Sequence, residues 1–110
     1  IAMGTDAGTP FNKHGANAME LEFMADLGVK PIDALRFGTF AGADLMGLDD
    51  QGQVAVGMAA DFLIVEGNPG ADIKMASRLE NHRLVVKGGV AVSGQNASAA
   101  GPAFGRMAAF

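Results

Sequence analysis

The sequence contains no cysteine, no tryptophan and no tyrosine, and it has no long apolar run. The lack of cysteine excludes disulfides, Cys-ligated zinc and thiol catalysis, and it leaves the cellular compartment unknown. Nothing approaches the apolar length of a membrane span, so we expect no membrane partner. The chain opens on Ile1 with neither the basic start nor the apolar core of a signal peptide.

Positive charge is also scarce. Eight Lys and Arg residues stand against twelve Asp and Glu residues, which gives a formal net charge of −4. The basic residues form no cluster, and neutralising phosphates requires one, so we expect no nucleic-acid partner. The sequence has only two histidines, His14 and His82.

Apolar residues, by contrast, make up 49% of the 110 positions, enough for one ordered domain. The pattern predicts the end of a buried strand over 1–3, a loop over 4–15, and helices over 16–27, from Pro31 onward, and over 41–46. Met19, Phe23 and Leu27 recur every four residues, with Met24 beside them. This spacing predicts the buried face of the first helix.

From residue 48 onward the pattern changes to short strands. They are predicted over 54–56, 60–66, 83–87 and 90–92, with a hairpin turn at Gly88-Gly89. Residues 94–110 are predicted to be a flexible tail. So few strands leave open edges and an uncovered apolar face. We therefore expect a segment of a longer protein that, when isolated, is poorly soluble or oligomeric.

Gly4-Thr5-Asp6 is the strongest candidate for a site. It follows a short apolar stretch and opens into a Gly-rich loop, which is how a (β/α) barrel presents a catalytic carboxylate at its C-terminal face. By itself the motif fits a turn or capping role for Asp6 equally well. His14 lies in the same loop and is either a substrate contact or a residue that orders the turn. Asp61 is expected to bond backbone amides near the start of its strand.

Four motifs in order resemble the metal-dependent amidohydrolases, and within them the imidazolonepropionase-like and Xaa-Pro dipeptidase branches. They are Gly4-Thr5-Asp6-Ala7-Gly8-Thr9-Pro10 with His14-Gly15, Asn17 and Glu20-Leu21; Pro31-Ile32-Asp33-Ala34-Leu35-Arg36; Gly57-Met58-Ala59-Ala60-Asp61-Phe62-Leu63-Ile64-Val65; and Val85-Val86-Lys87-Gly88-Gly89-Val90-Ala91-Val92. The resemblance covers residues 1–93. It implies an α/β fold: the C-terminal part of a (β/α)₈ TIM-like barrel in residues 1–47, and strands of a small β-sandwich in residues 48–93.

The resemblance also implies a reaction, the metal-assisted hydrolysis of an amide or peptide C–N bond. The substrate class is a dipeptide of the Xaa-Pro type or an N-acyl amino acid. Asp6 would contact the metal and shuttle a proton from water to the leaving group. One alternative is a cyclic amide or imidazolone hydrolase of the same superfamily. Another is a non-catalytic structural fragment, if the chain stands alone.

The cofactor implied is a divalent metal, zinc by resemblance, as one or two ions. A catalytic metal needs about three protein ligands. The family's remaining ligands, a His-x-His, a carboxylated Lys and later histidines, are not in this sequence. We therefore expect most metal ligands to come from outside this chain. The expected partner is the N-terminal remainder of the enzyme. We also expect a homo-oligomer. Lys30 departs from the family's Ser or Thr cap.

Overall fold

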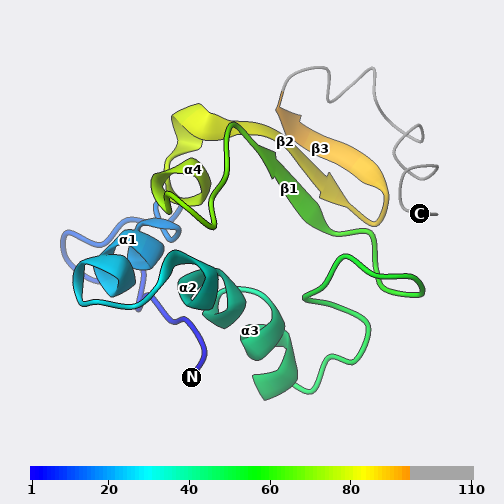
Figure 1. Cartoon of the computed structure of the whole chain (residues 1–110), viewed down its shortest axis with the longest axis horizontal. Coiled ribbons are helices and arrows are strands. Elements are labelled where there is room, and N and C mark those ends of the chain that lie inside the picture. The colour runs from blue at the N-terminus through cyan, green and yellow to red at the C-terminus, as the bar shows by residue number, and fades with distance from the viewer. Residues whose placement is uncertain (95–110) are drawn as a thin grey trace.

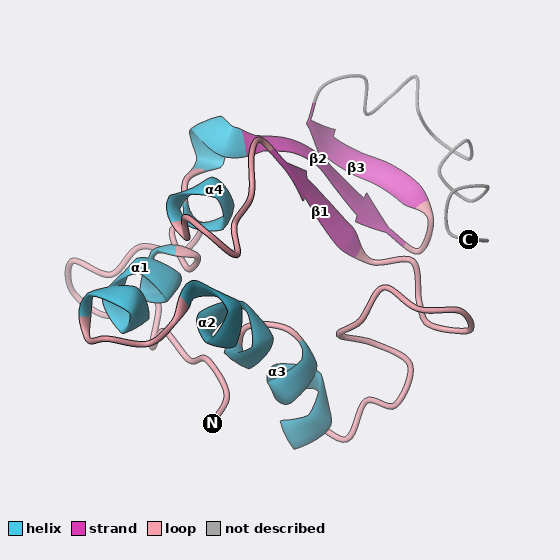
Figure 2. Ribbon diagram, in the orientation of Figure 1, coloured by secondary structure: helices cyan, strands magenta, loops and turns pink. Residues whose placement is uncertain are grey.

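The computed structural model describes residues 1–94 and shows a helical part followed by a three-stranded antiparallel sheet (Figures 1 and 2). The helical part holds α1 (Met19–Asp26), α2 (Pro31–Phe37) and α3 (Phe40–Leu45). A mixed helix and sheet structure is thereby confirmed. None of the helices in this part of the chain has the length and hydropathy needed to cross a membrane.

The helix boundaries follow local signals. Helix α2 begins at Pro31, whose fixed φ and missing N–H suit the first turn. Lys30 precedes it and makes no side-chain capping bond, as its departure from a Ser or Thr cap predicts. Helix α1 starts at Met19 rather than at residue 16: Ala16 has no regular structure, and residues 17–18 form a turn.

The prediction of which face of α1 is buried was wrong, because the buried face lies on another side of the helix. The helix buries Leu21 and packs Met24 and Ala25 against the same cluster. These three positions also follow helical spacing, i, i+3 and i+4. Phe23 and Leu27 are instead 55% and 88% exposed. Several apolar residues lie all round this helix, so periodicity alone did not determine which side meets its neighbours.

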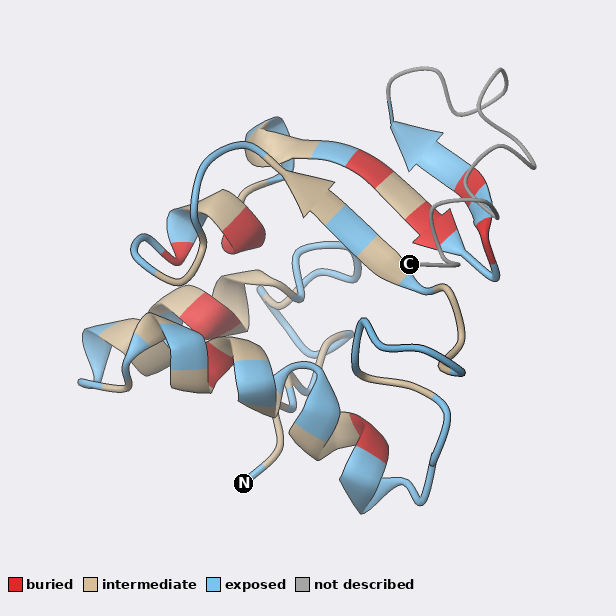
Figure 3. Cartoon of the chain, turned by 45° about the vertical axis from the view of Figure 1, so that its right-hand side comes forward, coloured by how far each residue is buried: buried red, intermediate tan, exposed pale blue. Residues whose placement is uncertain are grey.

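The helical core joins α1 to segments distant in sequence. Its buried members are Leu21, Ala34, Ile73 and Ala76. The last two belong to the region of α4 (Lys74–Ser77), a single helical turn that lies beside α1 (Figure 3). Residues that follow the first strand in the sequence therefore complete the core of the helical part.

The sheet has the order β1 (Phe62–Val65), β2 (His82–Lys87), β3 (Val90–Gly94), with both pairs antiparallel. A 3₁₀ turn, η1 (Leu79–Asn81), leads from α4 into β2. Leu84, Val86 and Ala91 form a second core, against which Phe62 and Ile64 pack. Residues alternate between the two faces of each strand, which explains why Val86 is buried while its neighbour Lys87 is exposed.

The β2–β3 hairpin confirms the predicted turn at Gly88-Gly89. Gly88 and Gly89 have φ of 57° and 80°, and positive φ at both central residues is the requirement of a type I′ turn. The Asp61 carboxylate accepts a 2.7 Å hydrogen bond from the Gly88 N–H, so it bonds a backbone amide as predicted, but the amide lies 27 residues away in the sequence and not near the start of its own strand. Gly94 ends β3, so the predicted tail 94–110 begins one residue too early. Residues 95–110 lie outside the described part of the chain.

Two predicted strands are absent from residues 1–94. Residues 54–56 form no strand, and Val54 and Val56 are 87% and 83% exposed. Residues 1–3 also form no strand, although the Met3 N–H donates to the Phe37 carbonyl at 2.9 Å. A parallel strand needs neighbouring strands for its backbone groups, and no described segment lies in that position.

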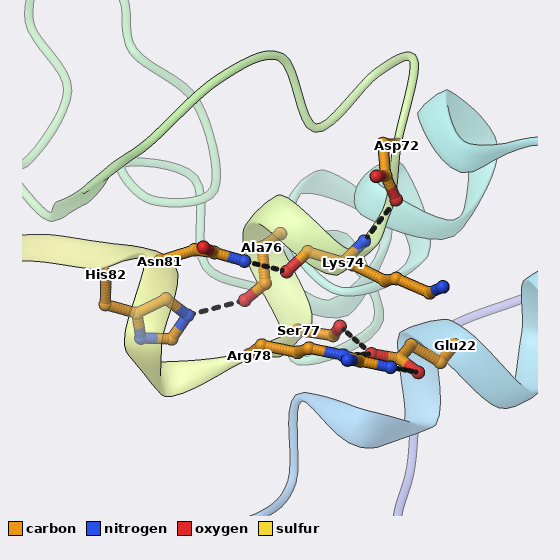
Figure 4. A network of polar contacts seen from close by, with 8 residues as sticks. All are labelled: Glu22, Asp72, Lys74, Ala76, Ser77, Arg78, Asn81 and His82. Carbon is orange, nitrogen blue, oxygen red and sulfur yellow. Dashed lines mark hydrogen bonds and ion pairs between the residues drawn. The ribbon is translucent and has the colours of Figure 1, made fainter.

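A charged contact ties α1 to the segment after α4 (Figure 4). Glu22 accepts hydrogen bonds from the Ser77 hydroxyl at 2.5 Å and from Arg78 Nε at 2.9 Å. The second Glu22 oxygen accepts from the Arg78 guanidinium at 3.3 Å. The hydrogen bond from Arg78, followed by that from Ser77, holds the pKa of Glu22 below its usual 4.5. Close to this contact in the sequence, His82 Nε2 lies 2.6 Å from the Ala76 carbonyl oxygen.

We predict that Glu22→Gln lowers the free energy of unfolding by about 1–2 kcal/mol at pH 7, because charge-assisted hydrogen bonds are lost from a carboxylate that is 12% exposed. The folded-state pKa is lowered, so the stabilisation is complete above pH 4.5 and is lost as pH falls through that lower value. Urea unfolding of both proteins at pH 7 and at pH 3 measures the difference. It should shrink at the lower pH.

Glu66→Gln is the matched control. Glu66 accepts from Arg83 Nε at the same 2.9 Å, but its side chain is 63% exposed. An exposed pair contributes at most about 1 kcal/mol, so this variant should unfold close to the parent. Equal losses of unfolding free energy in the two variants would contradict the assignment of the Glu22 contact as the stronger interaction.

A second prediction compares two glycines with similar backbones, Gly52 at φ 88° and Gly57 at φ 85°. A methyl group on Gly52 would lie 2.9 Å from Ala43 Cβ and 3.0 Å from Phe40 Cα, whereas one on Gly57 meets nothing within 4 Å. We expect Gly57→Ala to cost about 1 kcal/mol from the left-handed backbone. Gly52→Ala should cost roughly 2 kcal/mol more through overpacking. Thermal unfolding of the two variants measures the gap, and equal shifts would contradict the packing of this loop on α3.

Candidate functional site

Asp6 lies in the loop that joins Met3 to α1. This loop belongs to the blue segment that follows the N-terminus in Figure 1. Its backbone φ is 52°, a left-handed conformation that few non-glycine residues adopt. Its side chain is exposed. Its carbonyl oxygen accepts a 3.1 Å hydrogen bond from the Thr9 hydroxyl, and none of the hydrogen bonds found within residues 1–94 ends on its carboxylate.

Hydrogen bonds within the loop hold Asp6 in place. The Asn12 side-chain amide donates to the Thr5 carbonyl at 2.5 Å, and the Asn12 carbonyl accepts from the Gly8 N–H at 2.8 Å. Thr5 Oγ1 accepts from the Ala7 N–H at 3.3 Å. Thr5 and Thr9 thus satisfy backbone groups. Asn12 joins the two sides of the loop around Asp6.

His14 packs back onto this same loop. A methyl group added to Gly8 would lie 2.9 Å from His14 Nε2, so the imidazole occupies the space that a side chain at Gly8 would take. Gly8 also has φ 100°, which only glycine adopts readily. The structure therefore brings the two predicted site residues, Asp6 and His14, into one short loop. A substrate role for either stays a prediction.

A hollow of about 240 Å³ lies between this loop and α1. Thr5, directly before Asp6, forms part of its wall. The remaining wall combines aromatic and apolar side chains with amides and charges: Phe11, Asn12, Lys13, Ala16, Asn17, Met19, Glu20 and Phe23. The hollow can hold a group with one apolar part and one polar part.

The described residues do not make a complete metal site. Residues 1–94 contain no group of three or more His, Cys, Asp or Glu side chains placed to hold an ion. Asp6 offers one hard carboxylate, and His82 is bonded to the Ala76 carbonyl in another part of the fold. Asp6 could serve as one metal ligand, but a catalytic metal needs about three protein ligands. Any catalytic ion therefore needs further ligands from outside the described residues.

Phe11 is the residue of this site that the sequence analysis missed. It and Asp6 are the two non-glycine residues with positive φ in the described part of the chain, and Phe11 has φ 63°. A bulky residue in this conformation is an outlier. The signal in the sequence was weak: the pattern predicted a loop over 4–15, but nothing in that pattern shows which residue takes the strained backbone conformation.

Comparison with known proteins gives a consistent result. The model of the amidohydrolase family matches residues 1–92. The crystal structure of a Xaa-Pro dipeptidase with methionine bound in its active site is 38% identical, with a TM-score of 0.76 over 86% of this chain. An amidohydrolase structure is 26% identical, with a TM-score of 0.67 over 73% of this chain. The matches cover 22% and 20% of those two proteins, respectively. No curated protein sequence matches significantly.

We predict that Asn12→Ala loosens the loop around Asp6, because it removes the amide that donates to the Thr5 carbonyl. The Gly8 N–H, bonded to the Asn12 carbonyl, should then exchange with solvent about tenfold faster, since a lost bond of about 1.4 kcal/mol is a factor of ten. Amide hydrogen exchange by NMR measures this. Lys13→Ala in the same loop is the control, and a Gly8 rate unchanged in Asn12→Ala would contradict the bracing role.

Proposed function

The chain belongs to the amidohydrolase family, and from that premise we propose that it is part of an enzyme that hydrolyses the amide C–N bond of a dipeptide of the Xaa-Pro type. The observation that carries the proposal is the 38% identity to the Xaa-Pro dipeptidase structure across 86% of this chain. That neighbour holds methionine in its active site. A bound amino acid there supports an amino-acid-derived substrate here, with N-acyl amino acids in the same class.

Asp6 is proposed as the proton shuttle of this reaction. Its carboxylate is exposed and carries no hydrogen bond from the rest of the described chain. A carboxylate oxygen placed this way can accept a proton from the attacking water and return it to the nitrogen that leaves. The hydrogen bonds of the loop fix the backbone from which this carboxylate extends, and proton transfer requires hydrogen-bond reach of the substrate. His14, against Gly8 in the same loop, is proposed to contact the substrate.

A divalent metal, zinc by family resemblance, is proposed as the cofactor, with Asp6 as one ligand. The remaining ligands are proposed to come from the rest of the enzyme, because the described residues supply no cluster of three. The match spans about a fifth of each solved relative, which supports a large missing portion as the partner. A homo-oligomeric assembly of the whole enzyme stays a prediction.

The test is Asp6→Asn in the natively purified enzyme, together with whatever polypeptide is bound to it. Asparagine is nearly isosteric but accepts no proton at neutral pH. We expect kcat for a Met-Pro dipeptide to fall at least about 100-fold, with circular dichroism unchanged. Asp49→Asn, an exposed loop carboxylate, is the matched control and should keep parental kcat.

Two results separate the parts of this proposal. A parent enzyme that hydrolyses Met-Pro but keeps its rate in Asp6→Asn would contradict the role of Asp6 and leave the activity standing. A metal-containing parent that hydrolyses no dipeptide would contradict the substrate class. Metal content by elemental analysis, measured on the parent and on both variants, identifies the ion.

A further inference from the structure

Phe11 combines two unfavourable features at one residue. Its backbone is in the left-handed region at φ 63°, and its aromatic side chain is fully exposed. A strained conformation persists only where the surrounding structure enforces it, and such residues cluster at ligand-binding sites. Here the neighbouring Asn12 enforces it through bonds to Thr5 and Gly8. The loop therefore holds an aromatic ring out from the surface.

Phe11, whose side chain is fully exposed, is one of two aromatic residues that line a hollow beside this loop. Phe23, on α1, lines the same 240 Å³ space, and it is 55% exposed because the helix buries its opposite side. Met19 lies one turn earlier on the same side of α1 and also lines the hollow. Whole small-molecule pockets measure roughly 300–1,000 Å³. This hollow is smaller and suits one side chain of a larger substrate.

The hollow adjoins the residue that precedes the proposed catalytic group. Thr5 forms part of its wall, and the next residue is Asp6. The Thr5 carbonyl is fixed by the Asn12 amide, and Asn12 itself lines the hollow. A substrate whose side chain occupies the space between Phe11 and Phe23 would thus meet the same braced loop that carries the carboxylate.

We infer that the hollow between Phe11 and Phe23 is a specificity subsite that binds a large apolar side chain of the substrate, such as that of leucine or methionine. This inference rests on the proposed dipeptide hydrolysis and names its substrate class more closely. Phe11 and Phe23 act by burying apolar surface of the bound side chain, and burial discriminates between substrates by size. Neither residue takes part in proton transfer.

The experiment compares kcat/KM for Leu-Pro and Ala-Pro in the natively purified enzyme and in three variants. Phe11→Gly removes the ring and relaxes the left-handed backbone, so it keeps the fold. Phe11→Tyr keeps the ring and should keep the discrimination. Phe23→Ala removes the opposite wall. Phe40→Ala, an aromatic on α3 outside the hollow, is the control.

We expect the Leu-Pro over Ala-Pro ratio of kcat/KM to fall about tenfold in Phe11→Gly and in Phe23→Ala, through KM for Leu-Pro. The ratio should stay unchanged in Phe11→Tyr and Phe40→Ala. A parent-like ratio in Phe11→Gly, with full turnover, overturns the subsite and leaves the proposed function intact. Loss of turnover on both substrates alike also overturns it, because Phe11 would then support the fold or a neighbouring segment of the enzyme.

A binding measurement keeps the inference testable if the proposed activity fails. Titration of the same protein with L-methionine, and with glycine as the control, is followed by NMR at the amides of residues 11–23. Shifts with methionine alone, lost in Phe11→Gly, support the subsite independently of hydrolysis. The absence of methionine-specific shifts in an enzyme that hydrolyses neither dipeptide overturns both the subsite and the function.

Discussion

The packing of α1 against α2 and α4 is the contact on which the candidate site depends. Leu21, Ala34, Ile73 and Ala76 form its buried centre, and Met3 packs against them from the start of the chain. The Met3 N–H also bonds to the Phe37 carbonyl. The loop that carries Asp6 is therefore anchored at both ends, at Met3 and at α1. The Glu22 contact to Ser77 and Arg78 reinforces the second anchor.

The rest of the described chain has many uncovered apolar surfaces. The helical core and the sheet core are separate small clusters, and an open apolar gap of about 710 Å³ lies between α3 and β1. Met46 and Val54, which line it, are largely exposed. Burying such surface is the main favourable term in folding. These faces support the proposal that further parts of the enzyme cover them.

The sequence predicted features that depend on neighbouring residues better than features that depend on packing between distant segments. Pro31 and the Gly88-Gly89 turn act through their own backbone geometry, and both behave as expected. Asp61 bonds a backbone amide as expected, but that amide belongs to Gly88, 27 residues away in the sequence. The face of α1 and the strand at 54–56 depend on what packs against them, and both predictions were wrong. The placement of Asp6 and His14 in one loop followed from their spacing. The strained Phe11 did not, because the Asn12 amide that enforces it can be seen only in the fold.

The central claim is that residues 1–94 are one section of a larger hydrolase, and a denaturing intact-mass spectrum of the natively purified protein tests it most directly. We predict a polypeptide mass several times the 11.2 kDa of this sequence, either as one chain that contains it or as a second species purified with it. A single species of 11.2 kDa, monomeric and cooperative in unfolding, would contradict the claim. The likeness to amidohydrolases would then describe ancestry and not activity.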